Sequence, residues 1–400
     1  MKKKIIAIAS ALIFVAIGAA IVIKHPRKKY KAKQTIIHNE QAENSINAFD
    51  SKLFSSLCNQ SENVNYSAVS IYSLLYALSK GSDNNTQKEI NSVLEYTPSQ
   101  EIDKYVKNMI LTTENMSNSI WYNQDLNLQA KYKNFLSDFD FGQNKVDFSK
   151  TKSVQNQINS YVSQKTGRLI KKLLSGPLSP NTRLVLLNTL FFEQKWLIKF
   201  DKDETTTQDF YIQSDETTDV RMMQDLRFGF YYENEILQAA ELPYKDTRYS
   251  MIIFLPKDKN FDFSKLDLKD CLDTFKEEKE DKYLQIYLPK FEAHSHYDLI
   301  PVLQSLGIND AFQAGTADLS KIFADSEQIS LDDALHEVMV KVDEEKTKAV
   351  AVTMFGAKSA EGGHIDIDYI IFRADHPFCY VIYDEQNNIN LFTGIIRRPM

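Results

Sequence analysis

Two histidine motifs come closest to the spacing that catalysis or metal binding needs. His336-Glu337 begins like the H-E-x-x-H motif of zinc proteases, but the position four residues after His336 is Val340. His294 and His296 would share one face of a strand and could in principle bind a metal, yet no neighbouring side chain completes a ligand set. The chain also lacks a G-x-S-x-G nucleophile motif and a G-x-x-x-x-G-K phosphate loop. We therefore expect a protein that is not an enzyme and that holds neither a metal nor a cofactor.

The composition is typical of a globular protein without a nucleic-acid partner. Apolar residues make up 43% of the 400 residues and charged residues 25%. The formal net charge of −7 gives no electrostatic reason to expect binding to a phosphate backbone. Cys58, Cys271 and Cys379 are odd in number and far apart, so they predict no disulfide framework. We expect them to be buried free thiols.

The N-terminus carries an apolar segment that could enter a membrane. Residues 5–23 are uncharged, with Ser10 as the only polar side chain, and their length just spans a bilayer as a helix. An uncleaved signal anchor is the first interpretation, and a cleaved signal peptide ending near Gly18-Ala19-Ala20 is the alternative. Basic residues lie on both sides of the segment, so charge does not fix its orientation. Residues 24–37 read as a basic linker.

The remainder, residues 38–400, is predicted to form one α+β domain. Apolar residues at helical spacing predict helices from about residue 40 to 57 and after a serine cap near Ser67. From Arg183 onward strand-like runs prevail, at 184–192, 228–232, 249–255, 283–287, 379–383 and 390–396. Helical stretches at 264–277 and 298–306 interrupt them. No internal repeat or obvious linker divides this region.

Short motifs along this domain resemble those of the serpin family. They occur in the family's order from about residue 40 to 399, and the ordered set is far more specific than any one of them. They are Asn188-Thr189-Leu190-Phe191-Phe192 with Trp196 and Phe200, Val220-Arg221-Met222-Met223, Glu241-Leu242-Pro243-Tyr244, Ser250-Met251 to Leu255-Pro256, Leu288-Pro289-Lys290-Phe291, Leu306-Gly307 to Phe312, Phe372 to Phe378, and Phe392-Thr393-Gly394. The resemblance implies three β-sheets, about nine helices and an exposed reactive-centre loop at about 344–368.

The resemblance also implies a serine protease inhibitor that acts as a suicide substrate. A protease cleaves the loop and is held as an acyl-enzyme while the loop inserts into the main sheet as an added strand. About 15 inserted residues at ~3.3 Å each would carry the protease roughly 50 Å. The expected partner is a target protease, of the serine class first and the cysteine class second, bound by a monomer that is secreted or membrane-anchored on the extracellular side. A non-inhibitory serpin that acts as a binding or chaperone module is the alternative.

The first part of the loop has the composition of an inhibitory hinge. Small residues alternate with larger ones, and the small set would face the sheet interior after insertion. Lys346 stands where the family usually has glycine, which is a departure from the inhibitory pattern. The predicted hinge comprises Glu344, Glu345, Lys346, Thr347, Lys348, Ala349, Val350, Ala351, Val352 and Thr353.

Two further groups of residues are assigned by the resemblance. Ser67, Ser70, Asn188 and His336 match a buried hydrogen-bonding cluster beneath the strands that open, called the latch below. Trp196 matches the residue under the point where the loop first inserts. Seventeen residues counted from Glu344 place the reactive bond at Ala360-Glu361, with Lys358-Ser359 as the alternative.

Overall fold

The computed structural model describes residues 37–213, 216–324, 329–344 and 368–399. Contacts divide the chain into residues 1–35 and 36–400, and every described residue belongs to the second unit. None of the described helices combines the length and the apolar character needed to cross a membrane. The predicted apolar segment 5–23 lies outside the described residues, as do most of the hinge and both candidate reactive bonds.

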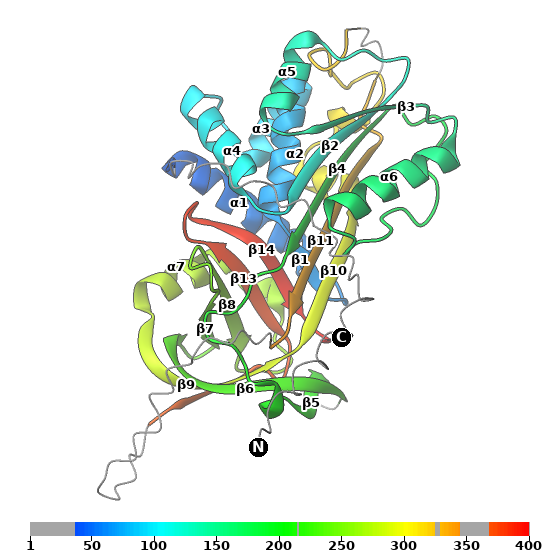
Figure 1. Cartoon of the computed structure of the whole chain (residues 1–400). Helices are drawn as coiled ribbons and strands as arrows, with labels where there is room; N and C mark the ends of the chain where they lie inside the picture. The colour runs from blue at the N-terminus through cyan, green and yellow to red at the C-terminus, as the bar shows by residue number, and fades with distance from the viewer. Residues whose placement is uncertain (1–36, 214–215, 325–328, 345–367, 400) are drawn as a thin grey trace, which may run out of the picture. The chain divides into compact units, whose positions relative to one another are not determined.

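The described residues confirm the α+β class (Figure 1). The helices α1, α2, α7 and α8 match the four stretches predicted as helical. The full set is α1 (Glu40–Leu57), α2 (Ala68–Gly81), α3 (Asn84–Leu94), α4 (Gln100–Thr112), α5 (Ala130–Asp138), α6 (Thr151–Lys165), α7 (Leu268–Glu278) and α8 (Ile300–Leu306), with short 3-10 turns at Lys202–Glu204, Phe263–Lys265 and Asp310–Phe312.

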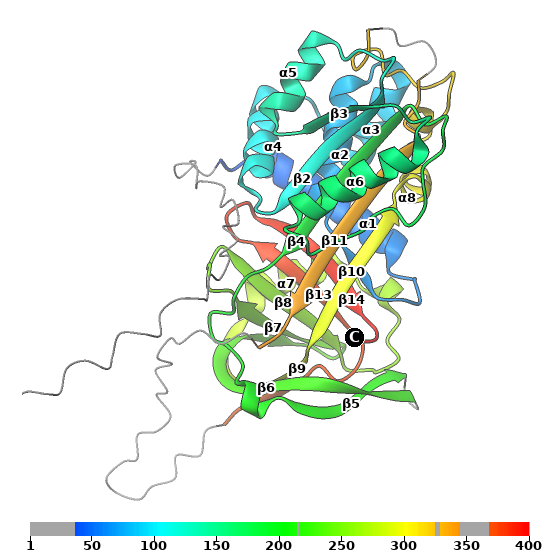
Figure 2. The same cartoon turned by 45° about the vertical axis from the view of Figure 1, so that its right-hand side comes forward.

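Five strands form the sheet that concerns the predicted site. Their order is β10 (Phe291–Asp298), β11 (Asp333–Val342), β4 (Leu184–Phe192), β2 (Met116–Asn123) and β3 (Gly142–Val146). The central neighbours β4 and β11 are parallel, whereas β10 pairs β11 and β2 pairs β4 in the antiparallel sense. Because successive side chains of a strand point to opposite faces, β4 contributes Leu186 to one core and Leu187 to another. The first core contains α1 and α2, and the second contains α6, so helices cover both faces of this sheet (Figure 2).

The remaining strands form a nine-stranded set in which β6 belongs to two parts. One part of β6 pairs with β7 and the other with β9, so β6 joins two groups of strands. The described strands therefore form two hydrogen-bonded sheets, the larger of which combines two of the three that were expected. Only 228–232 of β6 was predicted from the sequence, although the strand is 18 residues long. The strands of this set are β1 (Val64–Tyr66), β5 (Thr206–Gln213), β6 (Glu216–Glu233), β7 (Leu237–Pro243), β8 (Tyr249–Pro256), β9 (Glu280–Pro289), β12 (Ile370–Arg373), β13 (Phe378–Asp384) and β14 (Ile389–Ile396).

All three cysteines are free thiols, as the sequence predicts. Cys58 and Cys379 are buried, and burial raises the pKa of both thiols. Cys271 on α7 is only half-buried, so the expectation of three fully buried thiols is correct for two of them.

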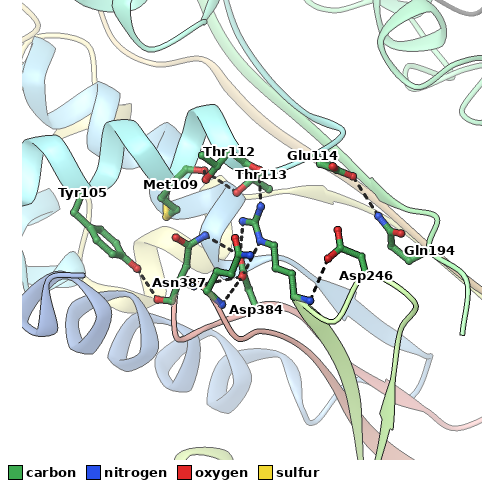
Figure 3. A network of polar contacts seen from close by, with 11 residues as sticks. Tyr105, Met109, Thr112, Thr113, Glu114, Gln194, Asp246, Asp384 and Asn387 are labelled. Carbon is green, nitrogen blue, oxygen red and sulfur yellow. Dashed lines mark hydrogen bonds and ion pairs between the residues drawn. The ribbon is translucent and has the colours of Figure 1, made fainter. Parts of the chain in front are cut away.

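A buried ion pair joins the end of α4 to the β13–β14 turn. Arg248 forms two parallel contacts with the Asp384 carboxylate, at 2.9 Å from Nε to Oδ1 and 2.6 Å from the second guanidinium nitrogen to Oδ2. The guanidinium also donates to the carbonyl oxygen of Thr112, where the helix leaves its last carbonyls unpaired. Asp384 accepts a further hydrogen bond from the side chain of Asn387 (Figure 3). Arg248, in the turn between β7 and β8, therefore connects the end of α4 to the end of β13 through its guanidinium.

Replacement of that carboxylate should be strongly destabilising. Asp384→Ala leaves the guanidinium of Arg248 buried without its charge partner, which typically costs ~3–5 kcal/mol. Asp273→Ala is the matched control, because it breaks the exposed Lys269–Asp273 pair on α7, where a loss of under ~0.5 kcal/mol is expected. Urea unfolding followed by circular dichroism measures both. Equal losses in the two variants would contradict the assigned role of Asp384.

Candidate functional site

The candidate site is built on the parallel pair β4 and β11. Residues 333–340 of β11 lie directly beside residues 185–192 of β4. The two strands are joined by one ladder of backbone hydrogen bonds. In this register His336 is paired with Asn188, so their side chains share a face and point toward α2. The family resemblance placed both residues in one cluster, but periodicity alone could not have paired them, because they are 148 positions apart.

A continuous chain of hydrogen bonds runs through the latch. The backbone N–H of Ser67 donates to Nε2 of His336 at 3.1 Å, and Nδ1–H of His336 donates to Oδ1 of Asn188 at 2.9 Å. The Asn188 amide then donates to Oδ1 of Asn118 at 2.7 Å, and the Asn118 amide donates to the hydroxyl of Ser73 at 3.1 Å. Each donor meets an acceptor only if the imidazole is neutral with its proton on Nδ1. The tautomer is therefore assigned by the pattern of partners.

Ser67 and Ser70 hold the start of α2 against this chain. Ser67 is the N-cap, and its hydroxyl accepts from the backbone N–H of Ser70 at 3.2 Å. The hydroxyl of Ser70 itself is buried and has no hydrogen-bond partner among the described residues. The structure therefore brings Ser67, Asn188 and His336 into direct contact, while Ser70 takes part through its backbone.

Asn118 and Ser73 complete the cluster, and neither residue was predicted from the sequence. Asn118 lies on β2 opposite Asn188, and Ser73 lies one turn after Ser70 on α2. An asparagine within an otherwise strand-forming segment was the one available signal, since such a residue needs a polar partner when it is buried. Without the order of the strands, that signal does not indicate which partner.

The imidazole of His336 is fully enclosed and strongly resists protonation. Burial, with a smaller contribution from His296, lowers the pKa of His336 from 6.5 to about 3. Protonation of His336 at Nε2 would break the hydrogen bond from the backbone N–H of Ser67, because a protonated Nε2 can no longer accept it. The link between α2, β11 and β4 is thus a neutral one at physiological pH.

The stability of the protein should depend on this histidine in mild acid. The unfolded chain binds a proton near pH 6.5 and the folded chain does not until about pH 3, so stability present above pH 6.5 is lost as the pH falls. His336 alone should remove about 1.6 kcal/mol between pH 6.5 and 5.0. Urea midpoints at these pH values should fall less steeply for His336→Gln, which keeps one donor and one acceptor. Parallel pH dependences in the wild type and the variant would show that His336 is not the group responsible.

The end of β11 is fixed by a second group of contacts. The indole N–H of Trp196 donates to the carbonyl oxygen of Asp343 at 2.9 Å, and its ring stacks on Tyr244 with the ring centres 4.4 Å apart. Glu344, the last described residue before the loop, pairs with Lys290 at 2.7 Å. Burial alone would raise the pKa of Glu344, but its hydrogen bonds and the nearby Lys290 lower it. The backbone at the end of β11 is therefore held in place by Trp196 at Asp343 and by Lys290 at Glu344.

His294 and His296 do not form a metal site in the described chain. Both lie on β10 and bind the two oxygens of Glu337 on β11, at 2.5 Å and 2.9 Å. The hydrogen bond to Glu337 raises the pKa of His294 above 6.5. Within the described ranges no group of three or more histidine, cysteine or acidic residues could hold a metal ion. The His336-Glu337 pair of the sequence is thus divided between the two faces of the sheet.

The remaining predicted site residues lie outside the described part of the chain. These are the hinge residues from Glu345 to Thr353, the candidate reactive bond Ala360-Glu361 and its alternative Lys358-Ser359. Their roles stay predictions from the sequence.

Comparisons with known proteins establish the family. The profile of the serpin family, described as serine protease inhibitors, matches residues 44–399. The chain is 31% identical over 390 residues to human Serpin B9, covering 90% of this chain and all of the relative. It is 30% identical over 370 residues to an uncharacterized serpin-like protein of Methanosarcina acetivorans, covering 88% of this chain and 85% of the relative.

Solved structures agree with this assignment. Uncleaved ovalbumin superposes with a TM-score of 0.82 at 22% identity, covering 90% of this chain and all of the other, and shows the fold alone. Native protease nexin-1 with heparin gives 0.77 at 26% identity, covering 89% and 99%. The chain therefore belongs to the serpin family, whose members are in general protease inhibitors and not catalysts.

Proposed function

We propose that this serpin inhibits its target protease by trapping it as an acyl-enzyme. The observation that carries the proposal is the parallel pairing of β4 with β11. The C-terminal end of β11, at Val342, is followed within two residues by Glu344, where the predicted loop begins. A strand inserted between the two would break one ladder and form two. Because each backbone hydrogen bond contributes about 0.5–1.5 kcal/mol net, insertion of a full strand is favourable if the latch can open.

The loop sequence supports an insertion that meets little steric resistance. Thr347, Ala349, Ala351 and Thr353 recur at every second position and are all small, so they fit the face of the strand that would be buried. Side chains of larger volume would have to displace packed residues as the strand enters, and overpacking typically costs ~1–3 kcal/mol. Slow insertion would let water release the protease, which makes the hinge the determinant of inhibition.

Trapping should be visible as a stable complex and should depend on the hinge. The full-length protein, kept in mild detergent because of residues 5–23, is incubated with trypsin, pancreatic elastase or papain and analysed on denaturing gels. A band of summed mass is expected for at least one protease. Thr347→Arg should abolish that band and leave cleavage intact, because a charged side chain would have to enter the core first. The matched control Lys348→Arg, at an outward position, should behave as the wild type.

One outcome would correct the hinge register, and another would overturn the proposal. Complex formation by Thr347→Arg would show that the hinge register is wrong. Clean cleavage of the wild type without any complex, and without a gain in heat stability, would favour a non-inhibitory serpin, for which Lys346 in place of the usual glycine is the supporting feature. Mass spectrometry of the released C-terminal peptide decides between Ala360-Glu361 and Lys358-Ser359 as the cleaved bond.

We also propose that residues 5–23 carry the protein to the extracellular side, as a signal anchor or a cleaved signal peptide. Nineteen consecutive residues without a charge are long enough for either role. N-terminal sequencing of the protein expressed in secreting cells is the test. A start at residue 1 in carbonate-washed membranes supports the anchor, and a start after about residue 20 in the medium supports cleavage. Recovery of the intact chain in the soluble intracellular fraction, after the membranes are removed by centrifugation, would contradict both the anchor and the signal peptide.

A further inference from the structure

An apolar surface without a partner lies on the outer face of β6, β9 and β12. Phe228 and Ile371 are each 54% exposed, which is unusual for side chains of this size. Leu226, Phe230 and Tyr369 are exposed beside them. We call these five residues the apolar patch.

The strand register places the patch residues on both sides of β9, with Gln285 of β9 between its β6 and β12 members. Leu226 on β6 and Ile371 on β12 are both paired with Gln285 of β9, so the three side chains form one row on one face. Phe228 is paired with Tyr283 in the next row, with ring centres 5.2 Å apart in an edge-to-face arrangement. Phe228 and Leu226 alternate with the buried Arg227, which faces the opposite side.

Cationic side chains border the patch. Lys279 lies over the ring of Phe230 with its nitrogen 4.2 Å from the ring centre, and Arg373 lies over Tyr287 at 3.6 Å. An apolar centre rich in aromatic residues with a charged rim is the arrangement that protein interfaces use. Isolated exposed apolar residues need no explanation, but a group gathered on one face of a sheet indicates an interaction site.

The position of the patch relative to the loop indicates which partner it meets. The described chain resumes at Asp368, so Tyr369 and Ile371 directly follow the predicted loop. Tyr369 is nine residues after Ala360, a length of chain that cannot exceed about 30 Å. A protease domain of roughly 200 residues is about 40 Å across. A protease that holds the predicted bond in its active site is therefore large enough to reach the surface on which the loop ends.

We infer that the apolar patch is a second contact surface for the target protease, and that it binds an apolar region beside the protease active site. This inference rests on the proposed function, because it takes the loop as the primary contact. Side chains such as Phe228 contribute to an interface chiefly by lowering the rate of dissociation before the chemical step. The patch would thus raise the rate of productive association and contribute to the choice of protease, separately from the sequence around the cleaved bond.

The experiment measures the association rate constants of full-length variants with trypsin, pancreatic elastase and papain. The double variant Phe228→Ser/Ile371→Ser should associate about tenfold more slowly with at least one protease that cleaves the wild type. The fraction of cleaved molecules that end as denaturant-stable complex should stay unchanged, since neither residue lies in the hinge or the latch. Ile236→Ser, at an equally exposed residue of the β6–β7 turn, is the matched control and should keep the wild-type rate.

A second measurement separates this inference from the proposed function. Trypsin and elastase whose catalytic serine is replaced by alanine can bind the loop but cannot form an acyl-enzyme. Weaker binding of such a protease by the double variant supports the patch even if no trapped complex ever forms. Equal rates and equal affinities for the double variant and the wild type would overturn the inference. It would also be overturned if the wild type sediments as a dimer that the double variant dissociates, because the patch would then join two copies of this chain.

Discussion

The hydrogen bond between His336 and Asn188 is the constraint on which the working of this sheet depends. It joins the two central strands side chain to side chain, in addition to their backbone ladder, and it connects both to the N-terminus of α2 through Ser67. Every member of the chain is shielded from water, so separating the strands exposes or orphans several polar groups together. A sheet closed in this way opens only when something replaces those interactions. An inserted strand is one such replacement, since it supplies a backbone ladder to each side.

The loop end and the middle of β11 are held by different interactions, which gives an order to the opening. At the loop end the contacts are the indole hydrogen bond from Trp196 and the Lys290–Glu344 ion pair, whose lysine is partly exposed to solvent. The carboxylate of Glu344 is buried, so only the lysine side of this pair is open to solvent. In the middle of the strand the neutral His336 is enclosed on all sides. Opening from the loop end toward the latch therefore reaches the more solvent-accessible contacts first.

The fold class could be predicted from the sequence because short motifs occur in the order of a known family. The same resemblance assigned Ser67, Ser70, Asn188 and His336 to one cluster, although only Asn188 stands within one of those motifs. It did not predict Asn118 or Ser73, since their role arises from β2 lying beside β4, a pairing over about seventy positions. The ion pair between Arg248 and Asp384 was missed for a similar reason. Most of β6 was also missed, because polar residues interrupt the alternation that identifies a half-buried strand. Each of these features depends on contacts between residues far apart in the sequence, whereas the periodicity of a sequence indicates only local structure.

The two ends of the loop have different roles if the proposed function holds. Insertion begins at Glu344 and carries the N-terminal part of the loop, with the attached protease, into the five-stranded sheet. Ile371 on β12 and Tyr369 just before it stay in place, because β12 is paired along four residues with β9 and does not take part in the insertion. A protease held at the cleaved bond must therefore leave the apolar patch as it is carried away. Contacts with the patch are present in the encounter and absent from the product, so they increase the rate of association without stabilising the trapped state. The surface that selects the protease and the sheet that holds it can then be altered independently by mutation.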